Sequence, residues 1–366
     1  MYLALYRKFR PSTFEGIVGQ EHITTTLKNQ IANNQIGHAY LFCGSRGTGK
    51  TSCAKVFARA INCLKPLKDG SPCGECEVCC KLQQSNNIDI LEIDAASNNG
   101  VDEIRDLREK IKYAPNVGRF KVYIIDEVHM LSPGAFNALL KTLEEPPAHA
   151  VFILATTEVH KLPATILSRV MRFDFKLIST QKIAENIARI FKESNIKSEE
   201  SATNLIASAG EGSMRDALSI ADMCASFCDN NITYDRVIEV LGISNKQTIY
   251  EVVESVLNQN VPKFFSEFDK IVKQGKNLTV VTTDITKTLR DLLVLKACGE
   301  NTTLVDYKPE LLKKMVELSN THSTVRINKV LQAFSKIETE LKYATNPQLL
   351  IETTALSVVD EEVKKN

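Results

Sequence analysis

The chain has 366 residues, of which 43% are hydrophobic and 24% are charged, and its formal net charge is +1. These proportions are ordinary for a globular protein with a sizeable core, and the length suggests two or three domains. A net charge so close to zero excludes a global positive field that would hold the protein on nucleic acid, so such contacts would need a local patch or backbone amides.

The first residues, MYLALYRKFRPSTF, contain no apolar run long enough for a signal peptide. No stretch of the chain approaches the roughly 20 apolar residues that a membrane span requires. We therefore expect a cytoplasmic protein with no membrane partner. In such a reducing compartment, clustered cysteines favour a metal site over disulfides.

Apolar runs alternate with helical patterns through the first half of the chain. The predicted strands are residues 38–43, 88–94, 120–126, 150–156 and 170–175. The predicted helices between them are residues 51–61, 100–114 and 133–147. This alternation predicts an α/β fold with a parallel sheet covered by helices on both faces.

After Phe175 the strand signal stops. Helical patterns cover residues 180–195 and 199–227, and every legible pattern from Ser244 onward is helical. Two apolar stripes at helical spacing mark this last part. They consist of Ile249, Val252, Val253 and Val256, and of Ile327, Val330, Leu331, Phe334, Ile337 and Leu341. We place the domain boundaries near residues 178 and 243.

A phosphate-binding signature follows the first predicted strand. It consists of Gly44, Ser45, Arg46, Gly47, Thr48, Gly49, Lys50 and Thr51, and fits G-x-x-x-x-G-K-[ST]. Its glycines let several N–H groups face one anion at a helix N-terminus. We expect Lys50 to reach the β- and γ-phosphates and the Thr51 hydroxyl to bind Mg²⁺. The alternative is a chance Gly-rich turn, which the preceding strand and following helix disfavour.

A carboxylate pair ends the predicted strand at 120–126. Asp126 stands where a metal-holding carboxylate belongs, and Glu127 beside it could orient the attacking water. The alternative is that both residues merely end the strand and cap the next helix. His129 completes the string DEVH, which is weak evidence for a helicase, and we expect it to pack or hydrogen-bond locally.

Five of the ten cysteines lie between residues 63 and 80. Cys73, Cys76 and Cys79 are spaced C-x2-C-x2-C, and Cys63 precedes them by ten residues. Four thiolates at this spacing would close a tetrahedral Zn²⁺ site that staples a short insertion. Cys80 could replace Cys79, although the spacing from Cys76 favours Cys79. Ordinary thiols and an iron–sulfur cluster remain as alternatives.

These motifs together resemble the gamma/tau family of bacterial DNA polymerase III clamp-loader ATPases, in the AAA+ superfamily. The segments that carry the resemblance are YRKFRPSTFEGIVGQEHI, HAYLFCGSRGTGKTS, the cysteine insert, LEIDAAS, FKVYIIDEVHMLSPGAFNALLKTLEEPP, LATTEVHKLPATILSR and EGSMRDALS. The resemblance covers the whole chain and is most specific over residues 1–242.

The resemblance implies roles for further residues. Thr157 occupies the first sensor position, where a polar side chain at a strand end contacts the γ-phosphate. Arg169 matches the arginine finger, which would complete a neighbouring subunit's site in trans. Arg215 matches the second sensor, carried by a small helical lid whose helix Ser213 could cap. Taken alone, each would be an ordinary strand-end hydroxyl or surface arginine.

The resemblance also implies a domain plan. A Rossmann-like P-loop AAA+ ATPase domain is expected at 1–178, with the cysteine insert at about 62–82. A small all-α lid is expected at 179–243 and an all-α collar, which would oligomerise, at 244–366.

The implied function is ATP-driven loading of a sliding clamp onto primed DNA, with ATP, Mg²⁺ and Zn²⁺ as cofactors. The implied partners are the other clamp-loader subunits in a hetero-oligomeric, pentameric ring, the clamp itself, and primed DNA bound without sequence specificity.

Two other functions are weighed against this one. A DEAH-type helicase needs a second RecA-like domain, which the helical remainder does not offer, and a branch-migration motor should lack the cysteine insert. A non-hydrolysing structural subunit of the clamp loader has no need of Lys50, Thr51, Asp126 and Glu127 together.

The expected contacts with adenine and DNA are less closely fixed. Adenine is expected near Arg10, Pro11, Ile17 and Val18, and DNA near the loop at 95–100 and near Arg105, Lys161 and Thr165. Some relatives carry basic residues where this chain has Asn98, Asn99 and Gly100, so phosphate contacts at that loop would fall to backbone amides.

Two departures from the family pattern concern Arg169 and the end of the chain. Val170 follows Arg169 where a cysteine is common in the family, a change that should not affect the arginine. The longer tau form continues past residue 366 into regions associated with helicase and polymerase binding. This chain therefore corresponds either to the short form or to part of a longer one.

Overall fold

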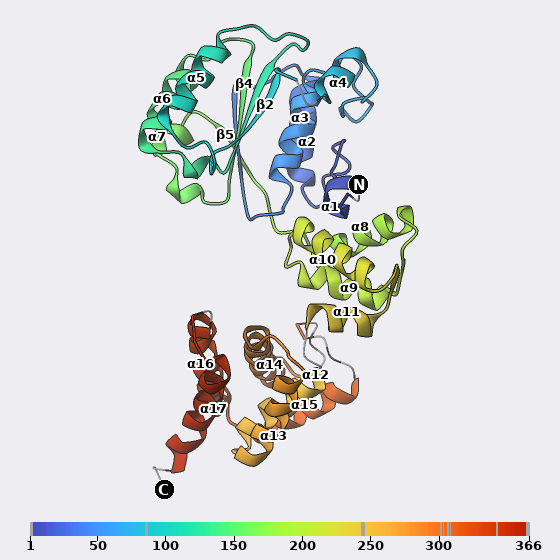
Figure 1. Ribbon diagram of the computed structural model, residues 1–366, viewed down its shortest axis with the longest axis vertical. Coiled ribbons are helices and arrows are strands. Elements are labelled where there is room, and N and C mark those ends of the chain that lie inside the picture. Colours follow the sequence, from blue (N-terminus) through green and yellow to red (C-terminus); the bar gives the residue numbers. More distant parts are fainter. Residues whose placement is uncertain are drawn as a thin grey trace. The chain divides into compact units, whose positions relative to one another are not determined.

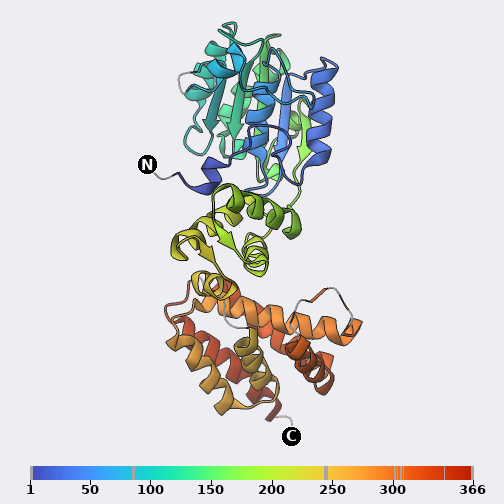
Figure 2. The same cartoon turned by 90° about the vertical axis from the view of Figure 1, so that its right-hand side faces the viewer.

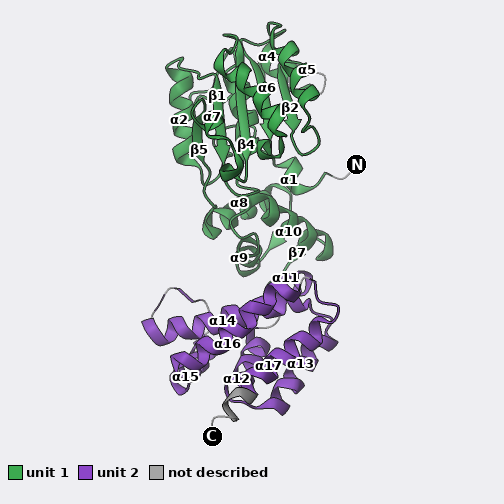
Figure 3. Cartoon of the chain, turned by 90° about the vertical axis from the view of Figure 1, so that its left-hand side faces the viewer, with its two compact units in different colours: residues 1–234 green, residues 235–366 purple. Residues whose placement is uncertain are grey.

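The computed structural model describes residues 3–84, 87–242, 246–300, 302, 304–305, 307, 309–341 and 343–363. The chain divides into two compact units, Met1–Tyr234 and Asp235–Asn366 (Figure 3). The nucleotide-binding motif, the cysteine cluster and all the predicted sensor residues belong to the first unit.

The first unit contains a five-stranded parallel sheet in the order β2-β3-β4-β1-β5. Three of its strands, β2, β4 and β5, are labelled in Figure 1. Its strands are β1 (Ala39–Cys43), β2 (Ile90–Asp94), β3 (Lys121–Asp126), β4 (Ala150–Thr156) and β5 (Met171–Asp174). The prediction of a parallel α/β sheet is confirmed. The central strands β1, β3 and β4 are buried almost throughout because they are apolar on both faces.

Helices cover both faces of this sheet (Figures 1 and 2). On one face, α2 (Glu21–Ala32) and α3 (Lys50–Ala60) pack Leu27 and Phe57 against strand residues such as Phe42. On the other face, α5 (Val101–Ile111) and α6 (Pro133–Glu144) pack their apolar stripes against the alternate strand residues. The result is a three-layer sandwich with two hydrophobic cores.

Short elements complete this part of the chain. They are α1 (Leu5–Lys8), α4 (Glu77–Leu82), α7 (Ala164–Leu167) and the 3-10 turns η1 (Val128–Met130) and η2 (Val159–Lys161). Both 3-10 turns begin soon after the carboxyl end of a central strand, η1 after β3 and η2 after β4. Turns at that edge of the sheet hold the backbone of the candidate catalytic segments.

The remainder of the first unit consists of the lid helices α8 (Thr180–Glu193), α9 (Glu200–Ala209) and α10 (Met214–Phe227). Ser179 and Ser213 each cap a helix by accepting a backbone N–H three residues on, which confirms the cap expected at Ser213. The expectation that no strands follow Phe175 is wrong, since β6 (Lys197–Ser198) and β7 (Asn231–Ile232) form a parallel pair. Two-residue strands are too short to produce an alternating pattern.

The second unit is helical in the residues that the structure describes, as expected. Its helices are α11 (Tyr234–Leu241), α12 (Lys246–Leu257), α13 (Val261–Lys273), α14 (Leu278–Cys298), α15 (Pro309–Thr321), α16 (Thr324–Leu341) and α17 (Pro347–Val363). Both predicted stripes lie in its single core, with Leu331 only partly buried. Among the described residues, no helix has the length and apolar character needed to span a bilayer.

Candidate functional site

The phosphate-binding loop lies between β1 and α3, at the carboxyl edge of the sheet. All three of its glycines have backbone conformations that other residues rarely adopt, with φ of 144° at Gly44, 77° at Gly47 and 102° at Gly49. A Cβ at Gly44 would lie 2.4 Å from the carbonyl oxygen of Phe175. The loop therefore needs glycine both for its curvature and for its close packing.

Lys50, the first residue of α3, is turned back over this loop. Its side chain is buried, with 6% of the residue exposed, and its Nζ donates to the carbonyl oxygens of Gly44 at 2.7 Å and Ser45 at 2.9 Å. Burial lowers the pKa of the amine, and the carboxylates of Glu127 and Asp126 oppose that shift. The ammonium is thus held at the mouth of the loop, where phosphate oxygens could replace the two carbonyls.

The Thr51 hydroxyl donates to Asp126 Oδ2 at 2.6 Å. This bond joins the start of α3 to the end of β3 and brings together two residues that are 75 positions apart. A hydroxyl and a carboxylate are oxygen donors of the kind that Mg²⁺ prefers, so this pair fits a magnesium ion bound with phosphates.

Glu127 follows Asp126 and has φ of 47°, an uncommon conformation for a residue with a side chain. Its Oε2 accepts hydrogen bonds from the Thr157 hydroxyl at 3.1 Å and from the Thr157 N–H at 3.3 Å. The structure therefore brings the candidate base and the candidate first sensor together at the ends of β3 and β4. Strained backbone of this kind is often found where a functional side chain must point in one direction.

The lid helix α10 touches the phosphate-binding loop at its own N-terminus. The Met214 N–H donates to the Gly47 carbonyl at 3.1 Å. A Cβ at Gly47 would lie 1.9 Å from Ser213 Oγ and 3.3 Å from Arg215 Cβ. The backbone of Arg215 therefore lies beside the phosphate-binding loop. Its guanidinium lies 5.5 Å from the centre of the Tyr6 ring.

Arg169 lies just after α7 and is placed differently. Its guanidinium donates to Glu144 Oε1 at 2.8 Å, to the Thr165 carbonyl at 2.8 Å and to Ser168 Oγ at 3.2 Å. About a third of its side chain is exposed. Among the contacts that the structure describes, none joins Arg169 to the phosphate-binding loop of its own chain, an arrangement compatible with action on a neighbour.

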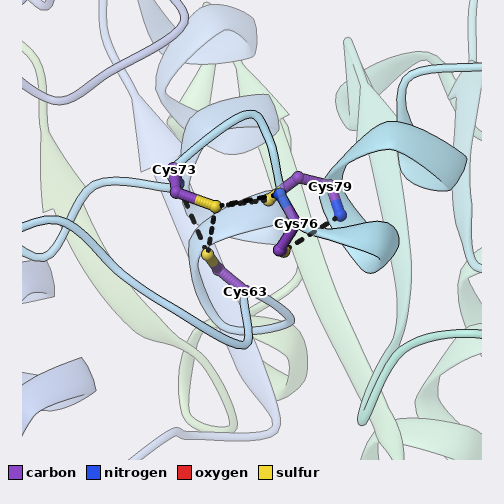
Figure 4. A group of neighbouring side chains, drawn as sticks. All are labelled: Cys63, Cys73, Cys76 and Cys79. Carbon is purple, nitrogen blue, oxygen red and sulfur yellow. Dashed lines mark hydrogen bonds between the residues drawn. The ribbon is translucent and has the colours of Figure 1, made fainter.

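The cysteine cluster is formed by Cys63, Cys73, Cys76 and Cys79, whose sulfur atoms all lie within 4.8 Å of one another (Figure 4). Backbone N–H groups of Cys73, Cys76 and Cys79 donate to sulfur atoms of the cluster at 3.3–3.4 Å. Cys80 is exposed and its sulfur contacts the carbonyls of Gly74 and Glu75 instead. The geometry thus brings Cys79, and not Cys80, into the cluster.

The electrostatics of the cluster fit a thiophilic dication. Burial raises the pKa of the Cys63 and Cys79 thiols. Burial also acts on Cys76, but N–H donors from Cys79 and Leu64 lower its pKa to about 6. A bound Zn²⁺ would stabilise all four thiolates and close a tetrahedral site.

Comparisons with known proteins show which family the chain belongs to. Three family descriptions match consecutive segments: the DNA polymerase III delta subunit at 19–179, the clamp-loader subunit ATPase lid domain at 182–230, and domain III of the gamma and tau subunits at 232–362. The DNA polymerase III subunit gamma of Buchnera aphidicola is 36% identical over 362 residues, which are 98% of this chain and 99% of that protein. The chain belongs to the DNA polymerase III gamma/tau family.

Other gamma/tau proteins are longer than this chain. The tau subunit of Bacillus subtilis is 43% identical over 98% of the chain, which spans 63% of that protein. The tau subunit of Escherichia coli is 38% identical over 97% of the chain, which spans 55% of that protein. Among solved structures, the Thermotoga maritima RuvB Holliday junction branch migration motor has a TM-score of 0.50 and 19% identity, covering 68% of this chain and 79% of its own. That likeness is one of fold.

Some residues of the gamma/tau site escaped sequence reasoning. Gln20 is fully buried and joins the Thr48 carbonyl to the backbone of Lys176, so it braces the loop against the segment that leads into the lid. Tyr6 lies under Arg215, and Glu144 holds Arg169. Gln20 lies within the segment YRKFRPSTFEGIVGQEHI that carries the family resemblance, whereas only the fold places Tyr6 and Glu144 beside their partners.

Replacing Gly47 with alanine should separate the lid from the loop. The new Cβ would clash with Ser213 Oγ, and φ of 77° disfavours a side chain. We expect the affinity for a fluorescent ATP analogue, measured by titration, to fall at least about tenfold, or ~1.4 kcal/mol. Gly275→Ala is the matched control, because Gly275 has φ of 66° but nothing within 4 Å of its would-be Cβ. Equal affinities for the two variants would contradict the prediction.

Proposed function

We propose that this chain is an ATP-hydrolysing motor subunit of the DNA polymerase III clamp loader, which loads the sliding clamp onto primed DNA. One observation carries the proposal: the loop around Lys50, the Thr51–Asp126 pair and the Glu127–Thr157 pair meet at one edge of the sheet in a gamma/tau chain. Together they supply the parts that phosphoryl transfer to water requires.

Each residue of this set has a distinct part in the proposed reaction. Lys50 and the loop amides bind the phosphates, while Thr51 and Asp126 hold the magnesium ion. When bound, magnesium supplies charge neutralisation on the phosphates. Glu127 orients the attacking water, and Thr157 orients Glu127 and the γ-phosphate. Arg215 would report the nucleotide to the lid.

Arg169 is proposed to complete the site of an adjacent subunit in trans. Its ion pair with Glu144 is partly exposed, so the pair stabilises this rotamer only weakly and a neighbour's phosphate can displace the carboxylate. Hydrolysis would then require an assembled ring.

The partners follow from the same proposal. They are the other clamp-loader subunits in a pentameric ring, the sliding clamp, and primed DNA gripped through its backbone. Among the candidate DNA contacts, Arg105 and Lys161 are exposed and pair with nearby carboxylates, Asp102 and Glu158. We also propose the three-domain division at about residues 178 and 243, with the last domain as the oligomerising collar, and a cytoplasmic location.

The alternatives have less support. A branch-migration motor shares the fold with this chain, but the gamma/tau match extends through residues 232–362. A structural subunit without hydrolysis has no use for the paired Thr51–Asp126 and Glu127–Thr157 contacts.

The proposed function predicts ATP hydrolysis that depends on assembly and on Arg169. In the complex with its sister subunits, turnover should rise with clamp and primed DNA together, and less with forked or four-way DNA. Arg169→Ala should bind ATP normally and lose at least about a hundredfold in turnover, since arginine fingers contribute about 10³–10⁵. Arg189→Ala is the control, because the exposed Arg189 side chain pairs with Glu193 and donates to Asn186 Oδ1, both on its own helix α8. Normal turnover by Arg169→Ala would refute the trans role.

We also propose that the cysteine cluster holds a structural Zn²⁺ ion. Protein purified without chelator should contain about one zinc per chain, measured by atomic emission. Cys79→Ser should lose it, whereas Cys80→Ser should keep it. Because binding requires thiolates, protons compete with the metal, and the apparent zinc affinity should fall as the pH is lowered from about 8 to about 6. Equal zinc content in the two serine variants would contradict the assignment.

A further inference from the structure

His129 is a buried histidine that the reaction described above does not use. Its side chain is 6% exposed and lies in η1, two residues beyond Glu127. Nδ1 lies 3.0 Å from Thr156 Oγ1 and 3.4 Å from Glu127 Oε2, and Nε2 lies 3.0 Å from Glu158 Oε2. Both ring nitrogens therefore face residues of the candidate site.

The ring links the two segments that carry the candidate base and the candidate sensor. One segment follows β3 and contains Glu127. The other runs from Thr156, the last residue of β4, to Glu158, and it contains Thr157 between these two histidine partners. The Glu158 N–H also donates to Thr156 Oγ1 at 3.0 Å, which ties that second segment into a compact turn. His129 thus connects the segments at the ends of β3 and β4, which pair side by side in the sheet.

Glu127 Oε2 lies between two groups as a result. Thr157 donates to it from its hydroxyl and its N–H at 3.1 and 3.3 Å, and the edge of the His129 ring lies 3.4 Å away. The ring limits the rotation of the carboxylate whichever nitrogen carries the proton.

Glu158 is a suitable anchor for the far side of the ring. Chiefly the Lys161 ammonium, with a smaller contribution from His129, holds the pKa of the Glu158 carboxyl below its usual range. The group is therefore a carboxylate at neutral pH, which accepts a hydrogen bond from the Lys161 ammonium and lies 3.0 Å from His129 Nε2. His149, by contrast, contacts a backbone carbonyl, that of Ile111.

We propose that His129 is a positioning residue for ATP hydrolysis, which holds the Glu127 carboxylate in line with Thr157 by bridging Thr156 and Glu158. This inference rests on the proposed function. A general base or water-orienting group loses much of its effect when it is misplaced by about 1 Å. Loss of the ring should therefore reduce turnover and leave ATP binding almost unchanged, because Lys50 and the loop amides are untouched.

Two conservative variants separate positioning from packing. The asparagine amide can occupy the place of Nδ1, facing Thr156 and Glu127, but does not reach Glu158. The longer glutamine amide can occupy the place of Nε2, facing Glu158, but leaves the side of Glu127 open. A purely structural role would not distinguish the two in this way.

The experiment measures kcat and KM for ATP in the assembled complex with clamp and primed DNA, together with the melting temperature of each variant. His129→Ala and His129→Gln should lose at least about tenfold in kcat with KM within about twofold, and His129→Asn should stay within about threefold of the parent. His160→Gln is the matched control, because His160 is 73% exposed and its ring lies 3.9 Å from Glu158.

Each outcome decides the proposal. The predicted order of kcat, with ATP binding retained, supports positioning. Parental kcat in all three variants overturns it, as does an equal loss of kcat in all three that follows a common fall in melting temperature. A parent complex without ATP hydrolysis contradicts the proposed function itself and the positioning role with it.

Discussion

The parallel pairing of β1, β3 and β4 is the constraint on which the site depends. Parallel strands end at the same edge of a sheet, so the loop after β1, Asp126 at the end of β3 and Thr157 after β4 meet there although the chain separates them widely. The Thr51–Asp126 hydrogen bond records this convergence at 2.6 Å. A change in strand order would keep every motif in the sequence and destroy the site.

A second constraint couples the conformation of the phosphate-binding loop to the lid. Gly47 has no side chain, and Ser213 and Arg215 at the start of α10 occupy the space beside it. The N-terminal end of a lid helix therefore lies directly on the phosphate-binding loop, with the Met214–Gly47 backbone bond between them. Any movement of the loop around phosphates must displace this helix or tighten its contact. The Arg169 guanidinium is bound by the Thr165 carbonyl and the Glu144 carboxylate, so the proposed action on a neighbouring subunit would require it to exchange these partners.

The sheet, the phosphate-binding loop and the cysteine cluster could be predicted from the sequence. The strands that form the sheet are continuous apolar runs, and the phosphate-binding motif has a fixed spacing between two such elements. The cysteine spacing indicated the four members of the cluster because consecutive C-x2-C steps limit the geometry. Sequence patterns therefore predicted the features formed by residues that are close in the sequence or that recur at a regular spacing.

The remaining contacts depend on tertiary structure. The residues around His129 in the sequence do not indicate that its ring contacts Glu158. The contact forms because β3 and β4 are neighbours in the sheet. The Glu144–Arg169 pair and the Tyr6–Arg215 contact join elements whose order in space no local pattern encodes. The strands β6 and β7 are stabilised by pairing with each other and carry no periodic signal.

The central claim is that a nucleotide bound at the loop around Lys50 changes the conformation or stability of the lid through the contact at Gly47. Amide hydrogen exchange of the assembled complex, with and without a non-hydrolysable ATP analogue and Mg²⁺, tests it most directly. The account predicts added protection both in the loop at 44–51 and in the first turn of α10, from residue 214 onward. Protection confined to the loop, with unchanged exchange in α10, would contradict it.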